Sequence, residues 1–418
     1  MVVSKAGIAE RPTKGGPCGP SFFCGQEAGL LVNFRQEKIP NAKIPDAKIP
    51  DGKIPDGKKS QGEGAGSLSY NMERILDYAV SLTLELLAIP SVAGDCVEAV
   101  QRVSHEFEAL GLPFEETNKG ALIAVWRGAD DERHRVVSAH VDTLGATVRR
   151  IKPNGRLRLF PLGGFDWRSF AGENCFVRTL EGREYRGTVL PDHAARHAFV
   201  EAVRNEAHDL DNVELRLDIR TNSKETTEAL GIHCGDLVFF DPRSELTETG
   251  YLKSRFLDDK VGVAILLGAV KAMREQGLSP AHTTHFYISN YEEIGHGTPV
   301  MPPKTVEAAA VDVGVVAEGC ASSEHAVTIL SRDGVLPYDR EAVLQLKRLA
   351  DDEGIPYRID AYINYASDAS VAVRSGRDVR AVCFGPGTEA THHYERTHRD
   401  AVDASIRLLA AYLQSEIA

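Results

Sequence analysis

The chain has 418 residues, of which 43% are hydrophobic and 26% charged, so it has the composition of an ordinary globular protein and room for two or three domains. Its formal net charge of −12 argues against nucleic acid or an anionic membrane as the main partner, because either would repel it. The seven cysteines are scattered without zinc-finger spacing, and this odd count favours a reducing compartment. With no apolar run that could cross a bilayer and no signal-peptide pattern, we expect a cytoplasmic protein.

The first 68 residues lack the pattern of a folded domain. Lys-Ile-Pro occurs four times, at 38–40, 43–45, 48–50 and 53–55. Proline at every fifth position excludes a helix, and the few apolar residues cannot offset the entropy lost on ordering the chain. We predict a disordered extension over 1–68, with a partner-binding tail as the alternative.

The segments 69–147 and 252–418 alternate between helix and strand patterns, which predicts an α/β fold with a mainly parallel sheet and helices on both faces. We predict that these two segments form one discontinuous domain. The helical spacings cover 72–89, 96–110, 258–277, 340–352 and 398–417, with a further helix start at Ser367-Asp368. The predicted strands are 121–126, 135–139, 283–289, 309–316, 326–330, 357–362 and 379–384.

Between these two parts, residues 148–251 are rich in strand patterns separated by turn signals such as Asn154-Gly155 and Glu181-Gly182. A helical pattern is present only over 193–205. We predict an inserted β domain, either a small barrel or a sandwich.

Polar residues gather where predicted strands end. His140 and Asp142 follow one strand, a spacing that lets the Asp orient a metal-bound imidazole, although a surface His beside a carboxylate has the same pattern. Asp258 and Asp259 begin a helix, where capping alone accounts for carboxylates. Their neighbours are apolar, however, and anionic groups in such a place need a counter-charge.

Glu292 and Glu293 follow another strand in a glycine-containing loop, where one side chain can bind a metal and the other can act as a general base. Asp312 is a polar residue inside an apolar strand and needs a partner, either a metal or a loop hydrogen bond. His398 opens the last helix and is a further candidate for the site, and His392 and His393 are competing candidates for the same role.

In combination these stretches resemble the M42 family of metallo-aminopeptidases, the glutamyl and tetrahedral aminopeptidase group of the dinuclear-zinc peptidases. The resemblance covers about residues 72–418. It rests on Ile-Pro-Ser-Val-Ala-Gly, Ala-His140-Val-Asp142-Thr-Leu-Gly, Gly163-Gly164, Leu-Asp258-Asp259-Lys-Val-Gly, Glu292-Glu293-Ile-Gly, Val-Asp312-Val and the late His398.

The resemblance implies an enzyme, a hydrolase that removes N-terminal residues from peptides with two divalent metal ions. Zinc is the first expectation, and cobalt or manganese could serve. His140 and Asp312 would bind one ion and Glu293 and His398 the other, while Asp258 would bridge both. Glu292 would be the general base that activates a metal-held water, and Asp142 would orient His140. The family also implies a homo-oligomer assembled through the β domain.

Some residues depart from the family pattern. His296-Gly297 follows the Glu-Glu-Ile-Gly motif where many members have a longer aliphatic or basic continuation, and Glu318 is a possible substitute for Asp312 as a ligand. The departures indicate a divergent subgroup. Three alternatives stay open: a metal-dependent deacylase acting on a small N-acylated peptide-like metabolite, a polysaccharide hydrolase (glucanase), and a non-catalytic oligomeric scaffold.

Overall fold

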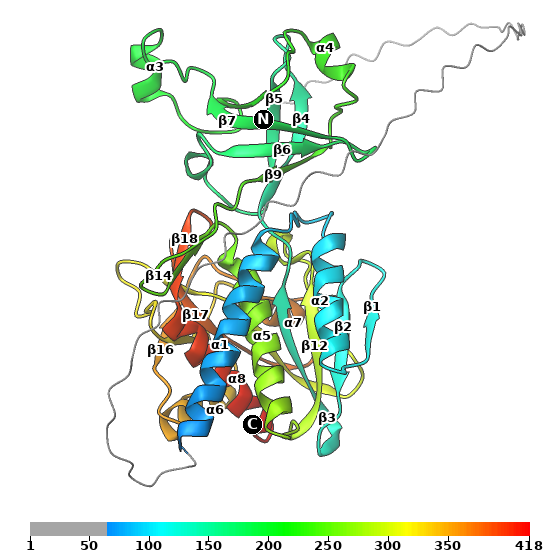
Figure 1. Cartoon of the computed structure of the whole chain (residues 1–418), viewed down its shortest axis with the longest axis vertical. Coiled ribbons are helices and arrows are strands. Elements are labelled where there is room, and N and C mark those ends of the chain that lie inside the picture. The colour runs from blue at the N-terminus through cyan, green and yellow to red at the C-terminus, as the bar shows by residue number, and fades with distance from the viewer. Residues whose placement is uncertain (1–64) are drawn as a thin grey trace, which may run out of the picture. The chain divides into compact units, whose positions relative to one another are not determined.

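The computed structural model describes residues 65–418 (Figure 1). The Lys-Ile-Pro repeats therefore lie outside the described residues, and so does most of the extension predicted over 1–68. The first described element, helix α1, spans Ala65–Leu87 and begins a few residues before the predicted start. Among the described residues, no helix is both long and apolar enough to cross a membrane.

A mixed sheet of twelve strands organises the α/β part of the chain. Its main path runs β1-β2-β12-β3-β13-β17-β18-β11-β10, while β14 and β15 also pair with β17 and β16 pairs with β15. The bounds are β1 Phe114–Glu116, β2 Leu122–Trp126, β3 Asp130–His140, β10 Glu245–Leu246, β11 Tyr251–Ser254, β12 His282–Ser289, β13 Thr305–Val311, β14 Gly314–Val316, β15 Val327–Arg332, β16 Tyr357–Ala361, β17 Arg380–Glu389 and β18 Glu395–His398.

The α/β class is confirmed, but parallel pairing is confined to part of the sheet. β12, β3, β13 and β17 are parallel neighbours, whereas β2, β11 and β18 pair antiparallel with the strands beside them. Helices occur in the connections between parallel strands, such as α5 between β3 and β12. Short connections join the antiparallel pairs β1–β2, β10–β11 and β17–β18, whereas the pairs β2–β12 and β11–β18 join strands that are far apart in the chain.

The remaining helices of this part are α2 Val97–Ala109, α5 Leu257–Glu275, α6 Arg340–Asp352, α7 Asp368–Arg374 and α8 Arg399–Gln414. Side chains of β13 alternate between the two sheet faces, as strand geometry requires. Ala309 and Val311 join the large core under α1, α2, α5, α6 and α8, and Ala308 and Ala310 join a smaller core with Ala369 of α7. Helices therefore cover both faces, as predicted, but most of them lie on one.

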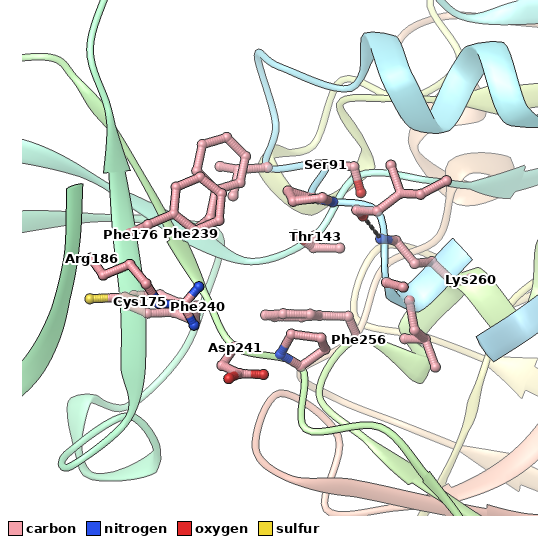
Figure 2. A pocket seen from close by; sticks show the side chains of 16 residues that line it. Ser91, Thr143, Cys175, Phe176, Arg186, Phe239, Phe240, Asp241, Phe256 and Lys260 are labelled. Atoms are coloured by element: carbon pink, nitrogen blue, oxygen red, sulfur yellow. Dashed lines mark hydrogen bonds between the residues drawn. The ribbon is translucent and has the colours of Figure 1, made fainter. Parts of the chain in front are cut away.

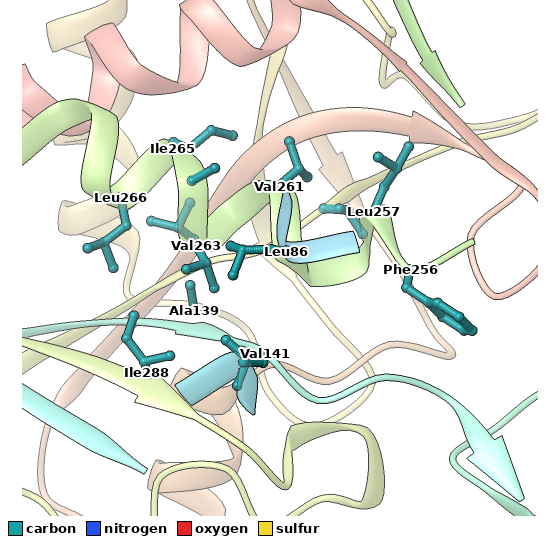
Figure 3. Close-up of a cluster of buried hydrophobic side chains, with 14 of the residues drawn as sticks. Leu86, Ala139, Val141, Phe256, Leu257, Val261, Val263, Ile265, Leu266 and Ile288 are labelled. Atoms are coloured by element: carbon teal, nitrogen blue, oxygen red, sulfur yellow. The ribbon is translucent and has the colours of Figure 1, made fainter. Parts of the chain in front are cut away.

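Helix α5 lies at the centre of the larger core. It is buried along nearly its whole length because it packs against both the sheet and the neighbouring helices α1 and α8. Figure 3 shows Val261, Val263 and Leu266 of this helix among Leu86 of α1 and Val141, with Ala139 and Ile288 of the sheet nearby. This packing holds the first turn of α5, which carries Asp258 and Asp259, close to the ends of β3 and β12.

The inserted segment forms a closed barrel in the order β4-β5-β8-β7-β6-β9, which decides between the two predicted forms. Its strands are β4 Gly145–Ile151, β5 Leu157–Leu162, β6 Asn174–Arg178, β7 Glu184–Pro191, β8 Val213–Leu217 and β9 Leu237–Phe240. The short helices α3 Val200–Asn205 and α4 Lys224–Glu228 lie in its loops, so the helical pattern over 193–205 yields a helix only in its second half. β10 and β11 belong to the large sheet and not to the barrel.

Candidate active site

The central parallel strands end side by side at the candidate site. Ser289 of β12 pairs with His140 of β3, so the loop that carries Glu292 and Glu293 starts beside His140. Asp312 follows the last residue of the neighbouring strand β13. The carboxyl ends of parallel strands are the usual place for a ligand site in an open α/β sheet. The strand register therefore brings together residues that are more than a hundred positions apart.

Asp258 faces two different histidines. Its Oδ1 lies 3.2 Å from His140 Nε2, and its Oδ2 lies 3.5 Å from His392 Nε2. A cis peptide bond joins Asp258 to Asp259, and both residues have non-helical backbone angles at the start of α5. No side chain caps this helix by a hydrogen bond at its N-cap, Phe256. Both oxygens of Asp258 face imidazoles, so capping, the structural alternative for this carboxylate, does not account for its position.

Asp142 holds the loop that bears the glutamates. Its Oδ1 accepts the backbone N–H of Glu292 and its Oδ2 accepts that of Glu293, each at 3.1 Å. His140 Nδ1 lies 3.0 Å from the backbone carbonyl oxygen of Asp142 and 3.5 Å from its carboxylate. Asp142 therefore contacts His140 as predicted, but mainly through its carbonyl, and its carboxylate has the further task of positioning both glutamates.

The two glutamates point to different histidines. Glu292 Oε2 lies 3.8 Å from His140 Nε2, and Glu293 Oε2 lies 3.7 Å from His392 Nε2. Ligand atoms of His140, Asp258 and Glu293 lie within 4.8 Å of one another, and so do those of His140, Asp259 and Asp312. Asp312 is buried and contributes to the group, whereas Glu318 is exposed and takes no part in it.

The structure does not bring His398 to this group. His398 ends β18, pairs with Tyr251 of β11, and places its Nε2 2.9 Å from the carbonyl oxygen of Thr249. β18 leads away from the site, whereas His392 lies in the loop before β18 and contacts Asp258 and Glu293. We therefore replace His398 with His392, which the sequence offered only as a competing candidate.

Two supporting contacts of His392 were missed in the sequence. The buried carboxylate of Glu395 accepts the backbone N–H of His392 at 2.9 Å and that of Asp258 at 3.0 Å. His392 Nδ1 lies 2.5 Å from the carbonyl oxygen of Gly164, in the loop that follows β5 of the barrel. The inserted domain thus orients one of the site's histidines, the outer-shell role that backbone carbonyls have at metal sites.

The electrostatics of the group show a shortage of positive charge. Burial and the Asp258 carboxylate raise the pKa of Asp312 to about 8, and the same two causes raise that of Glu293 to about 7 despite His392. Burial, with Asp312 among the neighbouring carboxylates, also raises the pKa of Glu292 well above its usual value. The protein's own side chains therefore do not allow all these carboxylates to ionise together.

The pKa values of the two imidazoles are also raised, which favours their positively charged form. Burial lowers the pKa of His140, but Asp142 and Asp258 outweigh it and hold that pKa well above the usual value. Glu293 and Asp258 have the same effect on the pKa of His392. Glu293 Oε1 and Asp259 Oδ1 are buried without a hydrogen-bond partner. Imidazole and carboxylate donors with unpaired buried oxygens fit divalent cations, which supply the missing charge.

A cleft of about 640 Å³ opens beside the group. One side of the cleft is lined by residues of the acidic group, namely Asp258, Glu292, Glu293, Asp312 and His392. The rest of the lining is largely apolar and includes one guanidinium: Val315, Val335, Ile363, Tyr365 and Arg374. The cleft therefore has space for a substrate next to the acidic group.

A second cavity, of about 220 Å³, lies where the barrel meets the start of α5 (Figure 2). Phe176 and Phe239 of the barrel, Phe256 and Lys260 are among its lining residues. Lys260 Nζ donates to the carbonyl oxygens of Leu86 and Ile89 at 2.8 and 2.7 Å, and burial lowers its pKa to about 7. This amine caps the end of α1. Because no residue of the acidic group lines this cavity, the chemistry is assigned to the cleft.

Comparisons with known proteins agree with this arrangement. The model of a family described as M42 glutamyl aminopeptidase matches residues 120–408. The protein YhfE of Bacillus subtilis (strain 168) is provisionally named an aminopeptidase. Its sequence is 41% identical to this chain over 80% of this chain and 97% of its own length.

Two solved structures share the fold. An aminopeptidase from Desulfurococcus kamchatkensis superposes with a TM-score of 0.70 at 22% identity, covering 84% of this chain and 96% of its own. The TET1 peptidase of Pyrococcus horikoshii, described as assembling into a tetrahedron or a large octahedral shell, gives a TM-score of 0.67 at 21% identity over 81% of this chain and all of its own.

Proposed function

The chain belongs to the M42 family of metal-dependent aminopeptidases, and from this membership and the geometry around Asp258 we propose a site with two divalent metal ions. His140 and Asp312 would hold one ion, Glu293 and His392 the other, and Asp258 both. Zinc suits these imidazole and carboxylate ligands, and cobalt or manganese could replace it.

The observation that carries the proposal is the position of the Asp258 carboxylate. Its two oxygens face the Nε2 atoms of two different histidines, at 3.2 and 3.5 Å. A single ion pair needs only one of these contacts. Two cations held by this carboxylate would account for both contacts, and Asp312 and Glu293 would each supply one further carboxylate.

When bound, the two ions would polarise the scissile carbonyl and lower the pKa of a water molecule. Glu292 is the general base that takes the proton of that water and passes it to the leaving amine. Its raised pKa suits a group that must hold a proton between these two events. Asp142 fixes the backbone of Glu292 and Glu293 together, so the base and the ligand keep a constant separation.

We also propose that the substrate is a peptide with a free N-terminus and that the chain forms a homo-oligomer through its barrel. The acidic lining of the cleft offers partners for a substrate ammonium group. The barrel segment exposes large apolar side chains, which is typical of an interaction surface: Phe160, Leu180, Phe199, Val200, Val203 and Ile219. The reported assembly of the TET1 peptidase supports the same proposal.

The proposed activity is tested by removing metal with a chelator and by acetylating the amino group of the substrate. We expect the protein to hydrolyse aminoacyl anilides with a free amine, to lose this activity on chelation, and to regain it when zinc, cobalt or manganese is added. Release of the aniline chromophore measures the rate. Cleavage of only the N-acetylated anilides would instead favour a deacylase. Full hydrolysis of a glucan after chelation would favour a glucanase, whose chemistry needs a carboxylate pair and no metal.

A comparison of three histidines tests the choice of ligand. We expect His392→Ala to lower turnover by more than about 100-fold, because it removes a ligand and not merely an outer-shell partner. The neighbouring variant His393→Ala and the variant His398→Ala should stay within a few-fold of the wild type, since neither side chain contacts Asp258 or Glu293. Initial rates of the three variants at saturating metal concentration show which histidine is the ligand. Loss of turnover in His398→Ala with an active His392→Ala would restore the original assignment.

A further inference from the structure

A second group of possible metal ligands lies outside the active site. His398 ends β18 and serves as the N-cap of α8, Asp400 lies in the first turn of α8, and His325 lies in the loop before β15. His325 Nδ1 is 2.9 Å and His398 Nδ1 is 3.1 Å from the same atom, Asp400 Oδ2. The two imidazole rings are 4.4 Å apart between centroids. Three possible ligand atoms, from the start of α8 and from the loop before β15, therefore lie within 4.8 Å of one another.

The far nitrogens of both rings face oxygen atoms. His398 Nε2 lies 2.9 Å from the carbonyl oxygen of Thr249, and His325 Nε2 lies 3.3 Å from the hydroxyl of Tyr251. A carbonyl can only accept, so the proton of neutral His398 resides on Nε2, and its Nδ1 presents a lone pair toward Asp400. This is the arrangement of a metal-binding histidine, whose second nitrogen donates to a backbone or side-chain oxygen.

Helix capping explains only part of this geometry. His398 Nδ1 accepts the backbone N–H of Asp400 at 3.1 Å, which satisfies one free donor at the start of α8. The same lone pair then faces the Asp400 carboxylate oxygen with no proton between them. Capping also does not require a second imidazole, yet His325 directs its Nδ1 to the same oxygen. A cation at the common point would satisfy all three donor atoms.

We propose that His325, His398 and Asp400 bind a divalent transition-metal ion, Zn²⁺ in the first instance, separate from the catalytic pair. Ligand atoms about 2.0–2.1 Å from a tetrahedral zinc ion lie roughly 3.3 Å apart. The two imidazole-to-carboxylate distances here, 2.9 and 3.1 Å, are close to that spacing, and all three ligand atoms lie within 4.8 Å of one another. Three protein ligands leave the fourth position for water. All three side chains are at least partly exposed, so an ion has access from solvent. The ion would join the loop before β15 to the first turn of α8 and so stabilise the folded state.

Equilibrium dialysis against Zn²⁺ tests the proposal on the full chain. We expect His325→Ala to bind one ion fewer per chain than the wild type, or to bind the last ion at least about 10-fold more weakly. His325 is the best position to change because it lies in a loop and caps no helix. The matched control is His105→Ala, an exposed histidine of α2, which should bind as many ions as the wild type. Aminopeptidase turnover should be unchanged in both variants.

Thermal unfolding gives a second readout that does not depend on activity. Addition of Zn²⁺ to protein whose catalytic ions are already in place should raise the unfolding temperature of the wild type and of His105→Ala, but not that of His325→Ala. Equal zinc stoichiometry and affinity in the wild type and His325→Ala would overturn the proposal. So would binding of no more than two ions by the wild type, a result that leaves the catalytic pair intact.

Discussion

We expect Asp258→Ala to lose two metal ions per chain relative to the wild type, and aminopeptidase activity with them. Both oxygens of this carboxylate face histidines, so its removal takes one ligand from each proposed ion. Removal of an outer-shell partner typically weakens metal binding about 10- to 100-fold, and loss of a shared ligand should exceed that. Elemental analysis of purified, dialysed protein measures the effect directly.

Folding must be separated from metal loss in this variant. Asp258 is buried, and its removal leaves His140 and His392 without their partner, so the far-UV circular dichroism of the variant should be recorded alongside its metal content. Asp258→Asn keeps the shape of the side chain and should lose metal without loss of helix content. Asp352→Ala, at the exposed end of α6, is the matched control. A folded Asp258→Asn protein with the full metal content would contradict the shared-ligand assignment.

The sequence predicts those elements of the fold whose structure depends on local periodicity. Helix α6 has the predicted bounds, Arg340–Asp352, because its apolar spacing lies within the helix and its N-cap, Asp339, directly precedes it, so local sequence determines both. The edges of the sheet were not accessible. β11 pairs with β18, about 145 residues later in the chain, and such a pairing depends on contacts that no local pattern contains.

Some residues of the candidate site could likewise be predicted from local sequence patterns, and others could not. His140, Asp258, Glu293 and Asp312 lie at ends of strands or at the helix start that local patterns predict, and the structure places them together. The choice between His392 and His398 depended on which end of β18 lies near Asp258, and only the tertiary structure shows this. The same holds for Gly164, whose contact with His392 joins the barrel to the catalytic part of the chain. In the sequence, Glu395 is a carboxylate that directly follows three aromatic or imidazole residues, which was the only available signal of its role. The structure shows that Glu395 is buried, and a buried carboxylate needs partners.

We expect Glu292→Gln to keep its metal ions and lose turnover by about 10²- to 10⁴-fold, the usual contribution of general acid–base catalysis. Gln has the size of Glu and can still accept a hydrogen bond, but it cannot take up the proton of the attacking water. The backbone N–H of residue 292 would still donate to Asp142, so the loop should keep its position. Single-turnover rates with an aminoacyl anilide, together with elemental analysis, measure the two properties separately.

The adjacent residue provides the sharpest control for this prediction. Glu293→Gln changes the same atoms one position away, on a side chain that faces His392 instead of His140. A neutral amide is a poorer metal ligand than a carboxylate, so Glu293→Gln should weaken binding of one ion, and added metal should restore part of its activity. No metal concentration should rescue Glu292→Gln, because its defect lies in proton transfer. If excess metal rescued both variants equally, the division between base and ligand would fail; an active Glu292→Gln protein would mean that another group, or the solvent, removes the proton.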